Sequence, residues 1–314
     1  MADLHPAALP PDDLDTIARR VTNWDRWGSD DELGTLNYIT PDMVVAAARL
    51  VRSGRIFELG VPLDRDGPQV NAPRRFNPVH MMTAIPDMDL RSGGAGIADD
   101  VLVLPLQAST QWDSLAHVTY KGVMYGGRST SRVTTRGAEV NSIRAISARV
   151  LTRGVLVDIA RYAGVASLEA GYAISVDDLE GALAAAQVTL GVGDALLIRT
   201  GYLAKCRADA WSGYIGETPG LGLETIEWIH HHQLAAVATD TVAVEVKPSQ
   251  IPGFLVAFHV LAITHMGLLM GEIFDLESLA EDCQNDGIFE FLFVAPPLPV
   301  TGGVGSPINP YAVK

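Results

Sequence analysis

The second half of the chain alternates between short apolar runs and segments with the spacing of an amphipathic helix. The apolar runs, which predict strands, lie at 152–162 (TRGVLVDIARY), 193–203 (GDALLIRTGYL) and 235–246 (AAVATDTVAVEV). The helical segments lie at 175–188 (SVDDLEGALAAAQV) and 218–234 (TPGLGLETIEWIHHHQL). Ser175 is placed as an N-cap, and Asp178 is close to the capping-box position. Strands that alternate with helices predict an α/β fold.

The first half opens with a helical segment that spans about 10–55. A second helix within it is expected to begin after Thr40, which is placed as an N-cap with Pro41 at the first helical position. Gly54 is expected to end this helix, because glycine is favoured just beyond a helix C-terminus.

A long polar excursion follows these helices. Strand-like runs at 55–63 and 99–110 flank a Pro- and Gly-rich stretch from Asp64 to Gly96. Loops of this length are uncommon in compact domains unless they have a function. We therefore expect the excursion at about 64–96 to cover a pocket.

The most apolar stretch, 251–270 (IPGFLVAFHVLAITHMGLLM), is long enough in principle to cross a bilayer. His259 and His265 lie inside it, and Pro252 breaks its start, so we interpret it as a buried helix or strand pair. No internal repeat or low-complexity linker divides the chain. One domain over 1–314 is the prediction.

Composition narrows the function further. The chain has 314 residues, 48% of them hydrophobic and 19% charged, which is typical of a folded globular protein. Its formal net charge of -14 disfavours a nucleic acid or an anionic membrane as partner, and a small molecule is favoured. Two cysteines are too few for a disulfide framework, and no charged start with an apolar run precedes Asp12. The sequence predicts a cytoplasmic location.

The polar segment STQWDSLAHV, at 109–118, follows a predicted strand and carries the clearest candidate chemistry. On an extended backbone Gln107, Gln111 and Asp113 would share one face, because side chains alternate along a strand. His117 follows Asp113 by four residues, a spacing that brings the two side chains together if the chain turns there. The segment is compatible with a metal site, a metal-free acid/base pair or a polar turn.

QASTQWDSLAH resembles a variant of the His-x-Gly-Thr-His-x-Asp-x-x-x-His motif of the metal-dependent cyclase and kynurenine formamidase-like hydrolases, a group that includes isatin hydrolases. NWDRWGSDDELGTLNYITP, MGLLMGEIFDLESLAEDC and FEFLFVAPPLPVTGGVGSPINP are similar to further landmarks of a Gln-Trp-Asp branch. The resemblance implies a swivelling β/β/α fold, with a barrel-like mixed β core and outer helices. It also implies a homodimer or homotetramer.

Carried over by position, two metal-binding histidines of the motif become Gln107 and Gln111 here. The resemblance further implies that Asp113 bridges the metal and that His117 is the acid/base residue. Glu272 matches the family's glutamate, and His259 is its expected partner. The ligand set would then be Asp113, Glu272 and His259. Gln111 and Gln107 would either complete this set or form hydrogen bonds with a bound substrate.

The two glutamines change the expected metal. A Gln oxygen is a hard, neutral and weak ligand, better suited to Mn²⁺ or Mg²⁺ than to Zn²⁺. The resemblance implies Mn²⁺ or Zn²⁺, so the expected cofactor is a divalent metal, Mn, Zn or Mg, with no metal as the alternative.

Three functions are compatible with these residues. The first, which the resemblance implies, is a metal-dependent hydrolase that opens an amide, lactam or lactone bond of a small substrate, including aromatic ones. The second is a metal-free cyclase, isomerase or dehydratase that uses Asp113 and His117 as acid and base. The third is a catalytically inactive binding protein on the same scaffold.

Four more residues are candidates for substrate binding, and each has a structural interpretation beside the functional one. Trp112 would point away from Gln111 and Asp113 on a strand and could be a core aromatic. Tyr125 could belong to an aromatic wall of the pocket. His80 could line the pocket from the excursion. Asp240 ends an apolar run, where a turn carboxylate is equally compatible.

Overall fold

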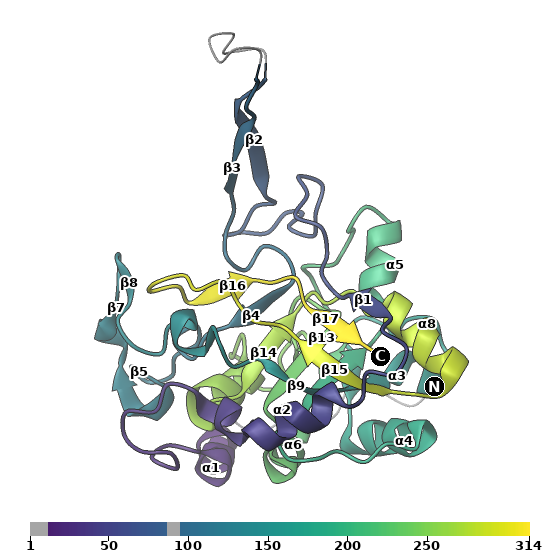
Figure 1. Cartoon of the computed structure of the whole chain (residues 1–314). Coiled ribbons are helices and arrows are strands. Elements are labelled where there is room, and N and C mark those ends of the chain that lie inside the picture. The colour runs from purple at the N-terminus through teal and green to yellow at the C-terminus, as the bar shows by residue number, and fades with distance from the viewer. Residues whose placement is uncertain (1–11, 87–94) are drawn as a thin grey trace.

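The computed structural model describes residues 12–86 and 95–314. A curled, mixed sheet of nine strands forms its centre, with helices around it (Figure 1). In sheet order the strands are β1 (Ile56–Glu58), β17 (Tyr311–Val313), β15 (Glu290–Val294), β9 (Leu151–Asp158), β11 (Ala195–Arg199), β13 (Ala236–Thr239), β14 (Leu269–Glu272), β4 (Gln111–Asp113) and β16 (Gly305–Pro307). The predicted α/β class with a barrel-like mixed β core is confirmed.

The four central strands, β9, β11, β13 and β14, run parallel, and the strands on either side of them pair antiparallel. The α-helices are α1 (Asp12–Val21), α2 (Pro41–Ala48), α3 (Ile159–Tyr162), α4 (Val176–Ala186), α5 (Tyr202–Ala208), α6 (Thr225–His232), α7 (Ala257–His259) and α8 (Glu277–Asp286). Four short 3-10 helices and one π-helix complete the helical segments: η1 (Gly34–Tyr38), η2 (Tyr125–Gly127), η3 (Thr130–Arg132), η4 (Ile143–Ile146) and the π-helix η5 (Val260–Met266).

Four two-stranded ribbons lie outside the main sheet. They pair β2 (Val79–Ala84) with β3 (Asp99–Val103), β5 (Val123–Met124) with β6 (Arg128–Ser129), β7 (Val133–Thr134) with β8 (Gly137–Ala138), and β10 (Ala173–Ile174) with β12 (Gly220–Leu221). The helix predicted over 218–234 is therefore a short strand followed by α6. The strand predicted over 235–246 ends at Thr239.

Both predicted helix starts are confirmed by their caps. The Thr40 hydroxyl accepts from the Met43 backbone, and Ser175 forms a complete capping box with Asp178. The helix after Thr40 is shorter than expected, because it ends at Ala48 rather than near Gly54.

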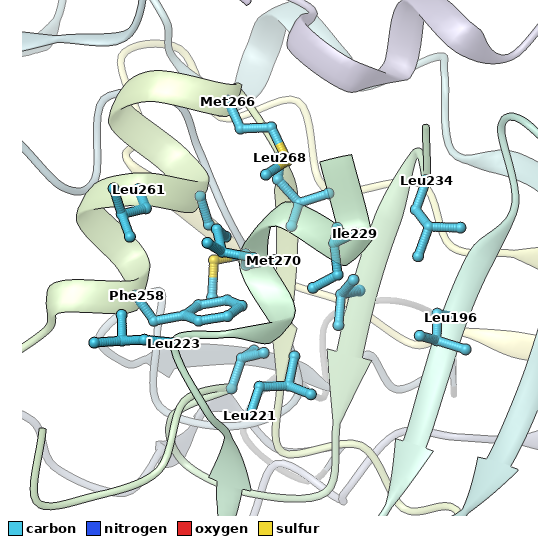
Figure 2. Close-up of a cluster of buried hydrophobic side chains, with 14 of the residues drawn as sticks. Leu196, Leu221, Leu223, Ile229, Leu234, Phe258, Leu261, Met266, Leu268 and Met270 are labelled. Carbon is cyan, nitrogen blue, oxygen red and sulfur yellow. The ribbon is translucent and has the colours of Figure 1, made fainter. Parts of the chain in front are cut away.

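Alternating side chains of the central strands fill two separate cores. Val155 and Val157 of β9 belong to a cluster with α4, α6 and η5, part of which Figure 2 shows. Leu156, which points to the other face, packs with Phe291 of β15 and with α8. Both faces of the central strands are thus covered, as expected for parallel strands in an α/β protein.

The apolar stretch 251–270 forms a helix followed by a strand: α7 continues into η5, and the chain then turns into β14. Within the described ranges, no helix is long and apolar enough to cross a membrane. This arrangement places His259 at the end of α7 and Glu272 at the end of β14, in two adjoining elements of the core.

The polar excursion is only partly a loop. It contains β2, which pairs with β3 just after the excursion, and the β2–β3 hairpin projects from the body of the protein (Figure 1). Every side chain of β3 is exposed. Residues 87–94 lie outside the described residues. The strand predicted over 99–110 ends at Val103, because a turn with a hydrogen bond from the Ala108 amide to the Pro105 carbonyl follows it. A pocket-covering role for the excursion stays a prediction.

We predict that Gly271→Ala destabilises the protein by about 1–3 kcal/mol, as overpacking of a core does. A Cβ at this position would lie 2.5 Å from the Trp112 ring and 2.7 Å from the Phe274 ring. Both rings are fully buried and cannot move aside cheaply. Urea unfolding measures the change. Gly191→Ala is the control, because its nearest atoms would lie 3.4 Å away or farther. Equal stabilities of the two variants would contradict the prediction.

Candidate functional site

The pairing of β4 with β14 builds the centre of the site. Gln111 lies opposite Glu272, and Trp112 lies opposite Gly271. Because neighbours on a strand face opposite sides, Gln111 and Asp113 point one way and Trp112 the other. The Gln111 amide donates to Glu272 Oε2 at 2.7 Å and lies 3.5 Å from Asp113 Oδ1. Glu272 therefore lies on the same face of the sheet as Gln111 and Asp113.

His259 completes this cluster from the end of α7. Its Nε2 lies 3.3 Å from Glu272 Oε1 and 4.0 Å from Asp113 Oδ2. One ligand atom from each of Asp113, His259 and Glu272 lies within 4.8 Å of the others. All three side chains are buried. The geometry is that of three ligands able to hold one metal ion.

Glu245 orients His259 and was not identified from the sequence. Its carboxylate accepts from the backbone amides of Phe258 and His259, at 3.1 Å and 3.2 Å, and from Nδ1 of the His259 ring. With its proton on Nδ1, the imidazole turns Nε2 toward Asp113 and Glu272. Metal-binding histidines are commonly held by such a carboxylate on the far nitrogen. The only sequence signal was an acidic residue inside the apolar run 235–246.

Burial and proximity shift the protonation of this cluster. Burial raises the pKa of Asp113, and the charge of Glu272 adds to that effect, although His117 opposes it. Burial would lower the pKa of His259, but hydrogen bonds to Glu245 and Glu272 outweigh it and raise the pKa to about 10. Without a metal ion, the His259 imidazolium therefore supplies positive charge among three carboxylates.

His117 lies at the open side of the cluster. The chain turns after β4, where the His117 amide donates to the Ser114 carbonyl, and the ring Nε2 comes to 3.6 Å from Asp113 Oδ1. The side chain is 22% exposed, whereas Asp113 is 1% exposed. The proximity expected from the four-residue spacing is present, and His117 can exchange protons with solvent.

Two cations near the cluster were also missed by the sequence analysis. Arg75, from the excursion, places Nη1 3.9 Å from Glu272 Oε2 and donates to the Gln107 carbonyl at 3.3 Å. Lys247 donates to the Ile215 carbonyl at 3.0 Å. Burial lowers the pKa of Lys247, although the charges of Glu272 and Glu245 oppose the shift. No local pattern marks these two residues, because distant chain segments bring them to the site.

Gln107 does not share a strand with Gln111, because it lies in the turn before β4. Among the described residues, its buried side-chain Nε2 has no hydrogen-bond partner. The same holds for Gln111 Oε1 and Asp113 Oδ2. Buried polar atoms without partners are costly unless something else satisfies them.

Trp112 and Tyr125 are both buried. The Trp112 indole donates to the Ala295 carbonyl at 2.8 Å and contacts Phe274 and Phe293 in the second core. The Tyr125 hydroxyl donates to Asp31 at 2.9 Å, and burial raises its pKa. These positions favour packing roles over the substrate contacts expected from the sequence.

Asp240 and His80 have other partners as well. Both carboxylate oxygens of fully buried Asp240 accept hydrogen bonds, from Thr200 and from the Gly201 amide. Asp240 therefore fixes the chain before α5. His80 lies on the exposed β2–β3 hairpin and pairs with Asp100 at 2.7 Å. No contact within the described part of the chain joins either side chain to the cluster around Asp113.

Comparison with known proteins identifies the family. A family model described as "Putative cyclase" matches residues 57–246. A crystal structure of "a novel cyclase" is 40% identical, with a TM-score of 0.84 over 94% of this chain and 100% of that one. The chain belongs to the cyclase family, which confirms the resemblance found in the sequence. None of the curated proteins searched matches the chain.

More distant structures share the fold. Isatin hydrolase A from Ralstonia solanacearum is 18% identical, with a TM-score of 0.64 over 87% of this chain and 97% of that one. A "predicted metal-dependent hydrolase" from Bacillus stearothermophilus is 13% identical, with a TM-score of 0.51 over 82% of this chain and 97% of its own. The chain therefore has the architecture of a group of cyclases and hydrolases.

Proposed function

We propose that this protein is a metal-dependent hydrolase that opens an amide, lactam or lactone bond of a small substrate, aromatic ones included. The observation that carries the proposal is the buried group of Asp113, His259 and Glu272, whose ligand atoms lie within 4.8 Å of one another. Carboxylate oxygens and imidazole nitrogens are ordinary ligands of divalent ions such as Mn²⁺ and Zn²⁺.

The residues present fit such an ion. Asp113 Oδ2 is buried and has no hydrogen-bond partner in the described part of the chain. Glu245 holds the His259 ring so that Nε2 faces the two carboxylates. An ion would satisfy the unpartnered oxygen and replace the proton on Nε2. Oxygen ligands outnumber nitrogen here, which favours Mn²⁺ or Mg²⁺, with Zn²⁺ the alternative that the family suggests.

When bound, the ion would polarise the scissile carbonyl and lower the pKa of water. The chain itself supplies the proton transfer. His117 reaches both the buried Asp113 carboxylate and solvent, so it can carry a proton to the leaving nitrogen or oxygen. Gln111, which donates to Glu272, keeps that carboxylate turned toward His259.

We also propose a homodimer or homotetramer in the cytoplasm. The projecting hairpin exposes Met81, Met82, Val101 and Leu102, and a two-stranded ribbon of this kind gains stability when it is covered. Both cysteines, Cys206 and Cys283, are free thiols, as expected in a reducing compartment.

Elemental analysis of tag-free protein purified without chelators tests the metal. We expect about one Mn, Zn or Mg ion per chain, and loss of that ion in an Asp113→Asn, Glu272→Gln double variant. Glu281→Gln on α8, an exposed carboxylate outside the three-ligand cluster, is the matched control. Wild-type protein that stays metal-free after incubation with all three ions would contradict the proposal of a metal-dependent hydrolase.

A metal-free acid/base enzyme is the second candidate. The observation that favours it is the His259 imidazolium, with a pKa of about 10, which can balance buried carboxylates without a metal. Asp113 and His117 would then catalyse a cyclisation, dehydration or isomerisation. A metal-free protein that still turns over such a substrate would support this candidate. An inactive binding protein would retain ligand affinity and show no turnover.

A further inference from the structure

With a divalent ion bound, the positive charges at the site would outnumber the negative charges of its carboxylates. Asp113, Glu272 and Glu245 bring three negative charges, and a divalent ion offsets two of them. Arg75 lies 3.9 Å from Glu272, and Lys247 shares a face of an extended stretch with Glu245, two residues before it. These two cations then leave an excess of positive charge. A net positive pocket favours an anionic ligand.

Within the described residues, neither cation has all of its hydrogen-bond donors satisfied. Arg75 has five N–H donors, yet its contacts in residues 12–86 and 95–314 are one hydrogen bond to the Gln107 carbonyl and one long ion pair. At 3.9 Å, that ion pair is longer than the roughly 2.7–2.9 Å of a charge-assisted hydrogen bond. Lys247 donates to a carbonyl, and no carboxylate of the described chain pairs with it within 4.0 Å.

A further donor lies beside Arg75. Gln107 Nε2 is buried without a hydrogen-bond partner in the described residues, and the Gln107 carbonyl accepts from Arg75. Arg75 thus contacts the backbone of Gln107, whose side chain holds a further N–H group without a partner in the described residues. Two or more such donors next to a cation form a common arrangement for binding a carboxylate.

Arg75 is also accessible to a small molecule. Its side chain is 29% exposed, although its guanidinium lies beside the buried carboxylate of Glu272.

We propose that Arg75 and Lys247, with the Gln107 amide, bind a carboxylate of the ligand and so select acyl compounds that carry one or release one. The inference rests on the proposed function, because hydrolysis of an amide, lactam or lactone produces a carboxylate. Such a group can be carried by the substrate from the start or formed in the reaction. Arg75 and Lys247 are then specificity-determining residues of the site.

Calorimetric titration of Mn²⁺-loaded protein tests the proposal without turnover. The probes are benzoate, monomethyl phthalate, which carries a carboxylate beside an intact ester, and neutral methyl benzoate. We expect the two carboxylates to bind and the neutral ester to bind at least about tenfold more weakly. Arg75→Gln and Lys247→Met should weaken carboxylate binding by about tenfold or more, with manganese content unchanged.

Arg74→Gln is the matched control, because it removes the exposed neighbouring arginine. Lys205→Met, at a lysine paired with Glu169 on the surface, controls for Lys247. If Arg75→Gln and Lys247→Met weaken the binding of monomethyl phthalate more than that of benzoate, the carboxylate belongs to the substrate. If they weaken benzoate binding more, the carboxylate belongs to the product. Either result supports the proposal.

Two results would overturn the proposal. The first is an Arg75→Gln variant that binds benzoate as tightly as the wild type, which would indicate that the carboxylate coordinates the metal directly. The second is equal binding of benzoate and methyl benzoate by the wild type. The two proposals can fail separately. Protein that holds manganese without any preference for carboxylates contradicts only the carboxylate site. Protein that binds no metal, yet loses benzoate binding on Arg75→Gln, contradicts only the metal-dependent function.

Discussion

Replacing His117 by alanine is expected to lower kcat by about 10²–10⁴-fold while the metal content stays unchanged. The reason is geometric. His117 is the titratable side chain that reaches both Asp113, at 3.6 Å, and solvent, and its ring is no member of the three-ligand cluster. The measurement is kcat on a substrate identified from a panel of lactams, lactones and N-acyl compounds, with metal analysis of the same samples.

His231→Ala is the control, because His231 is exposed on α6 and belongs to a different part of the chain. It should retain wild-type kcat. Added imidazole should restore part of the activity of His117→Ala, since the variant lacks a proton carrier rather than a structural element. Full turnover by His117→Ala would show that another group transfers the proton.

The second large effect is expected from Glu245→Gln, which should weaken metal affinity by about 10- to 100-fold. The carboxylate of Glu245 accepts hydrogen bonds from His259 Nδ1 and from two backbone amides of α7. A glutamine keeps the shape and an acceptor oxygen. It removes the negative charge that makes His259 a stronger ligand and fixes the tautomer.

Competition for Mn²⁺ with a fluorescent chelator measures this affinity directly, without any substrate. Glu217→Gln provides a control from an exposed glutamate of the preceding segment. Urea unfolding of both metal-free variants separates a loss of metal affinity from a loss of folding. Wild-type affinity in Glu245→Gln would contradict the assigned role of this carboxylate.

The part of the site that the sequence predicted is the part that is local. Gln111, Asp113 and His117 lie within one short segment, where the two-residue period of a strand and a following turn determine their relative positions. Glu272 and His259 were found through the family resemblance. Their contact depends on the pairing of β14 with β4, which periodicity cannot reveal.

The residues that the sequence did not reveal come from distant segments. Arg75 reaches the cluster from one stretch, and Glu245 and Lys247 from another. Neither stretch has a distinctive local spacing. Conversely, Trp112 and Tyr125 were candidates because aromatic residues suit both a pocket wall and a core. Their packing against core side chains is a tertiary property that composition does not decide.

The fold shows the same division between local and distant information. Cap residues predicted the starts of α2 and α4, because capping is a contact between residues three positions apart. The stretch 251–270 was ambiguous, since a buried helix and a buried strand are both uniformly apolar. In the structure this stretch forms both a helix, η5, and the strand that follows it, β14.

The alternation along β4 separates two kinds of evolutionary constraint. Of the three residues of β4, only Trp112 packs in the core that contains Leu156 and Phe291. Gln111 and Asp113 face the cluster. Substitutions on the cluster side can therefore exchange amides for imidazoles, or the reverse, without repacking the core behind them. A three-residue strand of this kind would let the residues of the proposed metal site diverge by point mutation while the scaffold is inherited intact.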